Sequence, residues 1–251
     1  MKPYTQKHQQ LIGAVTILSG ILALGSMIVG LIATNFNFET FSNPVELLDM
    51  ESATPALIKW FMLLDMFGYY LLLLPIVFYI HRELDRTTPW ASLITASGFA
   101  YVIIGALGAA ALAAAWPSTM AGYHSAAAND KEVYKASFLL SNDLVVKGMW
   151  NILEVWLAGV WWLGIGIVIT KSRFSKITTI VLGMGCVIDG LGEAAGMPAL
   201  AEIGLNVYLL LAIVWALWIG FAMLSKSTDA DRFGDVVITS ARSHTTLSGN
   251  V

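Results

Sequence analysis

Two apolar, helix-length segments near the end of the chain carry polar side chains that could bind a ligand. Asp189 and Glu193 are four residues apart on the first, and Glu202 and Asn206 are four apart on the second. Residues at this spacing share one face of a helix. The turn Gly-Met-Pro at 196–198 predicts that the two segments form an antiparallel hairpin. Because ionisable groups inside a membrane span are costly, they point to a functional site.

The composition predicts the elements that must position these side chains. Of 251 residues, 57% are hydrophobic and 12% are charged, whereas a soluble domain has roughly a quarter charged residues. Six segments reach the roughly 20 residues that span a bilayer: 11–34, 56–80, 90–116, 146–170, 177–196 and 199–224. We therefore predict an all-α polytopic membrane domain of six transmembrane helices over residues 1–225. A disordered cytoplasmic tail is expected over 226–251.

Prolines mark the expected helix boundaries. A cap residue followed by proline is typical of a first helical turn. Pro117 is expected to end the third span, and Pro75, inside the second, to kink it. The segment 43–50 is expected to form a short helix on the membrane surface, and the fourth span to extend outward as a helix from Lys131. Helix starts are expected at Asn43-Pro44, Thr54-Pro55, Thr88-Pro89 and Pro198.

The distribution of basic residues predicts the orientation. Ten lie on segments on the side of the N-terminus and two on the opposite side, which predicts N-in/C-in by the positive-inside rule. Size and compactness favour the bacterial cytoplasmic membrane. Trp60, Trp116 and Trp150 are expected in the outer aromatic belt. The inner set is Lys2, Lys7, Arg82, Arg86, Lys171, Arg173, Lys176, Lys226, Arg232 and Arg242, and the outer set is Lys131 and Lys135.

Counting residues along the helices predicts that the acids of different spans lie at similar depth. With a rise of 1.5 Å per residue, Asp189 lies about 18 Å and Glu193 about 24 Å from the inner edge, and Asp65 and Glu154 lie at about 22 Å. Every ionisable side chain within the spans falls in the outer half, above an inner half rich in aromatic residues. We expect an outward-facing acidic pocket with one wall on the hairpin and one opposite: Asp189, Glu193, Glu202 and Asn206, then Glu154, Asn151 and Asp65.

The acids must be stabilised in some way, and this defines the hypotheses for function. Four unpaired carboxylates would cost on the order of 10 kcal/mol, and Lys147 can neutralise one or two. The leading hypothesis is a pocket that binds a cation, a proton or a small amine for sensing or transport. One alternative is an accessory subunit whose acids only fix helix packing. Another is an enzyme acting on a lipid-linked substrate, with Glu193 or Glu154 as acid/base and His124 within reach.

Several classes of protein are excluded. A net charge of −3 without a basic stripe excludes a nucleic-acid partner. With four histidines and one cysteine, Cys186, the chain lacks the ligands for haem or zinc, so no cofactor is expected. Membrane lipids are expected partners. Gly/Ala-rich helix faces, including the GxxxG pair Gly192 and Gly196, predict close packing within the chain, with a homo-oligomer as the alternative.

Overall fold

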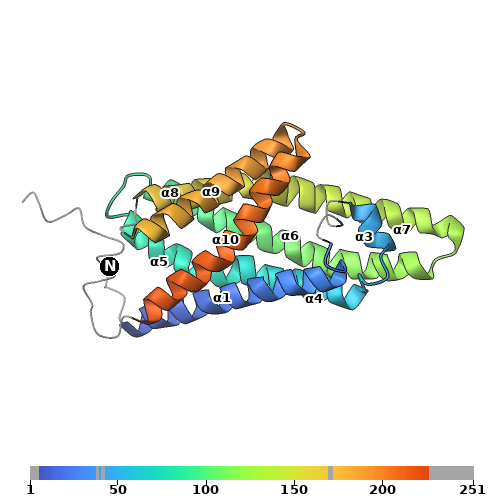
Figure 1. Ribbon diagram of the computed structural model, residues 1–251, viewed down its shortest axis with the longest axis horizontal. Helices are drawn as coiled ribbons and strands as arrows, with labels where there is room; N and C mark the ends of the chain where they lie inside the picture. The colour runs from blue at the N-terminus through green and yellow to red at the C-terminus, as the bar shows by residue number, and fades with distance from the viewer. Residues whose placement is uncertain (1–5, 38–39, 41–42, 169–171, 226–251) are drawn as a thin grey trace, which may run out of the picture.

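The computed structural model describes residues 6–37, 40, 43–168 and 172–225, and over these residues it is all-helical (Figure 1). The predicted tail at 226–251 lies outside the described residues. Six helices are long and apolar enough to cross a membrane, which confirms the predicted all-α, multi-pass class. These six are Gln6–Ala33, Pro55–Leu84, Ala91–Ser125, Ala128–Val168, Arg173–Ala194 and Pro198–Leu224.

Four of the six spans are single α-helices and two contain irregular segments. The regular ones are α1 (Gln6–Ala33), α6 (Ala91–Ser125), α9 (Arg173–Ala194) and α10 (Pro198–Leu224). The second span consists of α4 (Pro55–Asp65), the π-helical η1 (Met66–Tyr70), the 3-10 turn η2 (Leu71–Leu73) and α5 (Leu74–Leu84). The fourth consists of α7 (Ala128–Ser141), the π-helical η3 (Asn142–Glu154) and α8 (Val155–Val168). The π-helix is rare, and the single-turn π-bulges in which it mostly occurs frequently lie at functional sites.

The helix starts largely follow the predicted caps. The side chains of Asn43 and Thr54 accept hydrogen bonds from backbone N–H groups in the first turns of α3 (Pro44–Asp49) and α4. Pro198 opens α10 as predicted. The start of α6 differs, because the helix begins at Ala91 instead of at Pro89.

Pro117 does not end the third span, contrary to the prediction. It lies inside α6, which continues to the bound given above. Proline is tolerated in membrane helices where hydroxyl side chains bond to the local backbone. The next two residues carry hydroxyls that bond to the neighbouring backbone, although not to the Ala113 carbonyl that Pro117 leaves without a donor. Ser118 Oγ donates to the Ala115 carbonyl at 2.9 Å, and Thr119 Oγ1 donates to the same carbonyl at 2.7 Å.

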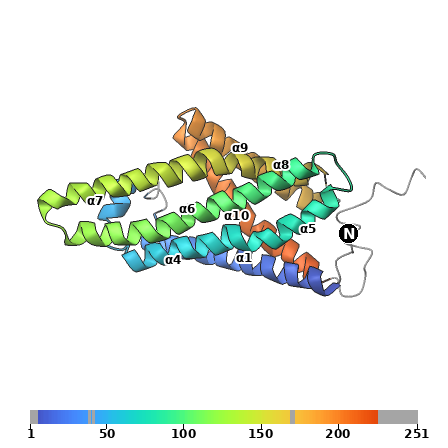
Figure 2. The same ribbon diagram turned by 180° about the vertical axis from the view of Figure 1, so that it is seen from behind.

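The helices α6 and α7 extend together beyond α1 and α4, with α3 lying against the extension (Figures 1 and 2). The fourth span therefore does continue outward as a helix, from Ala128. Leu47 and Leu48 of α3 are fully buried in the same apolar cluster as Phe138 and Trp116. Trp116 is thus a core residue, stacked on Phe138 at 4.7 Å, and its predicted place in an aromatic belt is wrong.

The beginning of α1 and the end of α10 lie side by side at one end of the bundle (Figure 1). A Cβ atom added to Gly13 would lie 2.8 Å from Cβ of Met223, so the two helices approach closely there. Both ends of the described chain therefore lie on the same side of the six-helix bundle.

Candidate functional site

The helices α9 and α10 form the predicted hairpin, and their close approach determines where Asp189 lies. Gly196 has φ +66° in the turn, a conformation that glycine adopts without strain. A Cβ at Gly192 would collide with the Ala201 backbone, and one at Gly204 with the backbone of Asp189. Of the GxxxG pair, Gly196 therefore forms the turn and Gly192 allows α9 and α10 to pack closely within the chain.

Asp189 is enclosed where the two helices meet. It is 0% exposed, and neither of its carboxyl oxygens has a hydrogen-bond partner. Asp65, at the end of α4, is 8% exposed, and its Oδ2 also lacks a partner. Buried polar atoms are normally hydrogen-bonded, so each such exception requires an explanation.

Glu154 lies in the same region and is bound by two tyrosines. It is 2% exposed at the end of η3. The Tyr70 hydroxyl donates to Oε2 and the Tyr208 hydroxyl to Oε1, each at 3.2 Å. Asp65 and Asp189 are close enough to act on Glu154 electrostatically. Carboxyl groups from α4, η3 and α9 are therefore gathered inside the bundle.

A third tyrosine extends the hydrogen bonding. The Tyr101 hydroxyl donates to the Tyr69 carbonyl at 2.8 Å and lies 3.0 Å from the Tyr208 hydroxyl. We call Asp65, Tyr70, Tyr101, Glu154, Asp189 and Tyr208 the carboxyl–tyrosine cluster.

The protons in this hydrogen-bonded chain can be counted. The three hydroxyls of Tyr70, Tyr101 and Tyr208 supply three protons for four oxygen–oxygen contacts. An ionised Glu154 only accepts, so one contact would lack a proton. A protonated Glu154 would supply the fourth, and the Tyr208–Oε1 contact would then reverse its direction. Glu154 would donate to Tyr208, Tyr208 to Tyr101, and Tyr101 to the Tyr69 carbonyl. The geometry fits the acid form of Glu154.

The irregular second span positions the tyrosines. In a π-helix each N–H bonds five residues back, which leaves some carbonyls without a helical donor. The Tyr69 carbonyl accepts from Tyr101, and the Gly68 carbonyl accepts from the Ser19 hydroxyl of α1. Pro75 lies just beyond, at the start of α5, and cannot donate to the Leu71 carbonyl. The helix is thus irregular before Pro75.

An aromatic cluster adjoins the carboxyl–tyrosine cluster. The Tyr101 ring stacks on Trp161 at 5.7 Å, and Trp162 packs against Trp161 at 4.2 Å and Trp215 at 4.6 Å. Trp161 and Trp162 are fully buried. Rings of this size fill space densely, so one side of the carboxyl–tyrosine cluster is closed by apolar bulk.

The remaining predicted residues lie nearer the surface. Asn151 Nδ2 donates to Glu193 Oε1 at 3.0 Å, and both residues are partly exposed. Glu202 and Asn206 are exposed, and Asn206 Nδ2 donates to the Glu202 carbonyl of its own helix at 2.9 Å. The structure joins Glu193 to Asn151 and leaves Glu202 and Asn206 outside that pair.

The expected neutralising groups do not reach the buried acids. Lys147 pairs with Asp143 at 2.7 Å, on an exposed face. His124 contacts the ring of Tyr123, with centroids 5.6 Å apart. Both oxygens of Glu154 already contact tyrosines. For acid/base chemistry on a bound substrate, Glu193 is therefore the more accessible of the two proposed residues.

The described residues contain no group of three or more His, Cys, Asp or Glu side chains placed to hold a metal ion. Cys186 is fully buried. The arrangement can store and exchange protons, because a carboxyl group in contact with hydroxyl groups is both a donor and an acceptor.

Sequence reasoning identified the acids and missed the tyrosines. Tyr70, Tyr101 and Tyr208 count as apolar in a hydropathy pattern, and tyrosines are usually expected at membrane interfaces. The available signal was their position well inside spans, where a buried hydroxyl needs a partner.

The fold and this site define a multi-pass α-helical membrane protein with a buried carboxyl–tyrosine cluster. Comparison of the chain with protein-family models, with curated proteins and with solved structures finds no match in any of the three.

Proposed function

We propose that this protein binds a proton at the carboxyl–tyrosine cluster and uses it for sensing or transport across the bacterial cytoplasmic membrane. The observation that carries the proposal is the proton count around Glu154. Four oxygen–oxygen contacts are satisfied together only when Glu154 is protonated. Loss of that proton would leave one contact without a hydrogen and a buried charge without a cation.

A proton fits this site better than a metal ion or an amine. Asp65, Glu154 and Asp189 are each less than a tenth exposed, so a larger ligand would have to displace packed side chains. A metal would also need converging ligands, which the described part of the chain does not offer. Glu193, which is partly exposed and lies one helical turn from Asp189 on α9, is the candidate entry point for protons from the surface.

The test uses Glu154→Gln, whose amide donates to Tyr208 and accepts from Tyr70 without titrating. We expect the infrared spectrum of the purified wild type at neutral pH to contain a protonated-carboxyl band that Glu154→Gln loses. A proton held in the folded state and released on unfolding makes the free energy of unfolding fall as pH rises, by at most about 1.4 kcal/mol per pH unit. In Glu154→Gln the free energy of unfolding should fall less steeply with pH, by the slope that corresponds to one proton.

Glu202→Gln is the matched control, because it removes an exposed carboxyl and should leave both the band and the pH dependence unchanged. Identical spectra and pH profiles for wild type and Glu154→Gln would refute the proposal.

A second candidate function is that of an accessory subunit whose acids fix helix packing. The observation in its favour is that Glu154 links the second and last spans through Tyr70 and Tyr208, and that Asn151 and Glu193 link η3 to α9. This role requires stability that depends on these contacts but not on pH. The same pair of variants therefore separates the two functions.

A further inference from the structure

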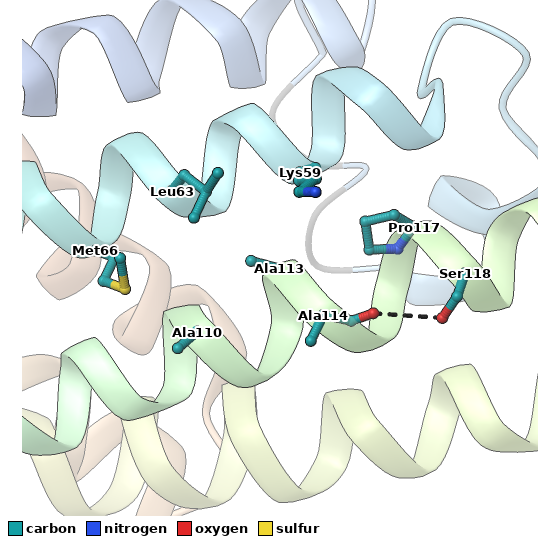
Figure 3. A pocket seen from close by; sticks show the side chains of 8 residues that line it. All are labelled: Lys59, Leu63, Met66, Ala110, Ala113, Ala114, Pro117 and Ser118. Atoms are coloured by element: carbon teal, nitrogen blue, oxygen red, sulfur yellow. Dashed lines mark hydrogen bonds between the residues drawn. The ribbon is translucent and has the colours of Figure 1, made fainter.

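A groove of about 520 Å³ lies between the second span and α6, and none of the residues that line it belongs to the carboxyl–tyrosine cluster (Figure 3). Small side chains on α6, including Ala110, Ala114 and Pro117, form one wall. Leu63 and Met66 form the other. The α6 residues recur at helical spacing on one face, and their lack of bulk leaves the space between the two helices open. The lining is apolar along most of its length.

Lys59 lies near one end of the groove, close to Pro117 and Ser118 (Figure 3). It is exposed, and within the described residues it forms neither a salt bridge nor a hydrogen bond. It lies just after the start of α4, next to Trp60, which is 60% exposed. An exposed tryptophan at the end of a span is typical of the level of the lipid headgroups. Lys59 is therefore a cation at headgroup depth beside an apolar groove.

We propose that this groove binds an anionic phospholipid, with one acyl chain between α4 and α6 and the headgroup phosphate at the Lys59 ammonium. The two ends of the groove match the two parts of such a molecule. An anionic lipid is preferred to a zwitterionic one because no acidic side chain of the described residues pairs with Lys59, whereas choline already compensates the phosphate of phosphatidylcholine.

The test compares phosphatidylglycerol with phosphatidylcholine of the same acyl chains, added to the full-length protein in an uncharged detergent. Apparent affinities are obtained from the rise of the thermal unfolding midpoint with lipid concentration. One interfacial lysine corresponds to about a fivefold preference for the anionic lipid. Lys59→Gln should abolish the preference. Ala114→Leu and, independently, Ala110→Leu fill the groove and should weaken the binding of both lipids.

Two matched variants control for general effects. Lys147→Gln removes another lysine near the end of a span, one already paired with Asp143. Ala111→Leu adds the same bulk on an exposed part of α6 that does not line the groove. Both should behave like the wild type.

Any of the following four results would overturn the proposal. Lys59→Gln could keep the preference, or the leucine variants could bind both lipids as the wild type does. Inorganic phosphate could reproduce the effect of phosphatidylglycerol, which would mean a simple anion site. Ala114→Leu could change the oligomeric state, which would mean that the groove seats a second copy of the chain.

Discussion

At the scale of single residues, Tyr101 connects the carboxyl–tyrosine cluster to the backbone. Its hydroxyl donates to the Tyr69 carbonyl and lies at hydrogen-bond distance from Tyr208, and the residue is 0% exposed. A buried carbonyl that loses its donor costs about 1–3 kcal/mol. The same hydroxyl also receives the proton that Tyr208 donates when Glu154 is protonated.

We therefore expect Tyr101→Phe to lower the free energy of unfolding by about 1–3 kcal/mol. It should also reduce the difference in pH dependence between wild type and Glu154→Gln. Both quantities can be measured by thermal unfolding in detergent. Tyr134→Phe removes a hydroxyl from an exposed residue of α7 and should have no effect. A harmless Tyr101→Phe would show that the hydroxyl chain contributes nothing to stability.

Residue counting along the spans identified the acids as candidate buried groups, but it could not predict their partners. Asp65, Glu154 and Asp189 were expected at similar depth, and all three are buried inside the bundle. Glu202 and Asn206 were expected on the same wall as Asp189 and are instead exposed. A helix face follows from spacing along one chain segment, whereas the partner of that face depends on how helices pack in three dimensions.

At the scale of elements, the second span shows where sequence patterns stop being informative. Pro75 indicates a local disturbance, and the structure places the irregular segment upstream of it, from Met66 to Leu73. The freed carbonyls are satisfied by hydroxyls of α1 and α6. Caps, turns and apolar spans follow from local composition. A π-helical segment depends on donors from other helices, which no local pattern contains.

Gly68 tests this element directly. A Cβ there would collide with the Ala23 backbone of α1, which cannot move aside as a side chain could. We expect Gly68→Ala to lower the free energy of unfolding by about 1–3 kcal/mol, the usual cost of overpacking. Gly25→Ala is the control, because its Cβ would meet only Leu64 Cδ1, at 3.8 Å. Equal stability of the two variants in thermal unfolding would mean that α1 and η1 can separate without loss.

At the scale of the whole molecule, the two ends of the bundle differ in character. The ends of α1 and α10 lie together at one end, and the extension of α6 and α7 with α3 lies at the other (Figure 2). The last turn of α5 carries Arg82 and the loop after it carries Arg86, whereas the extension carries Lys131 and Lys135. The positive-inside rule gives most weight to basic residues in the loops nearest the spans, and the distribution of ten basic residues against two predicts that the chain termini lie inside.

The last prediction concerns this orientation and uses single cysteines. Cys186 is fully buried, so it should give little background with a membrane-impermeant maleimide. Ser137→Cys introduces a thiol on the exposed face of α7, and Asp85→Cys introduces one in the exposed loop after α5. For N-in/C-in, Ser137→Cys should react in intact cells and Asp85→Cys only after permeabilisation. The reverse pattern would place the termini outside. It would also mean that Glu193, the proposed entry point for protons, faces the cytoplasm and not the exterior.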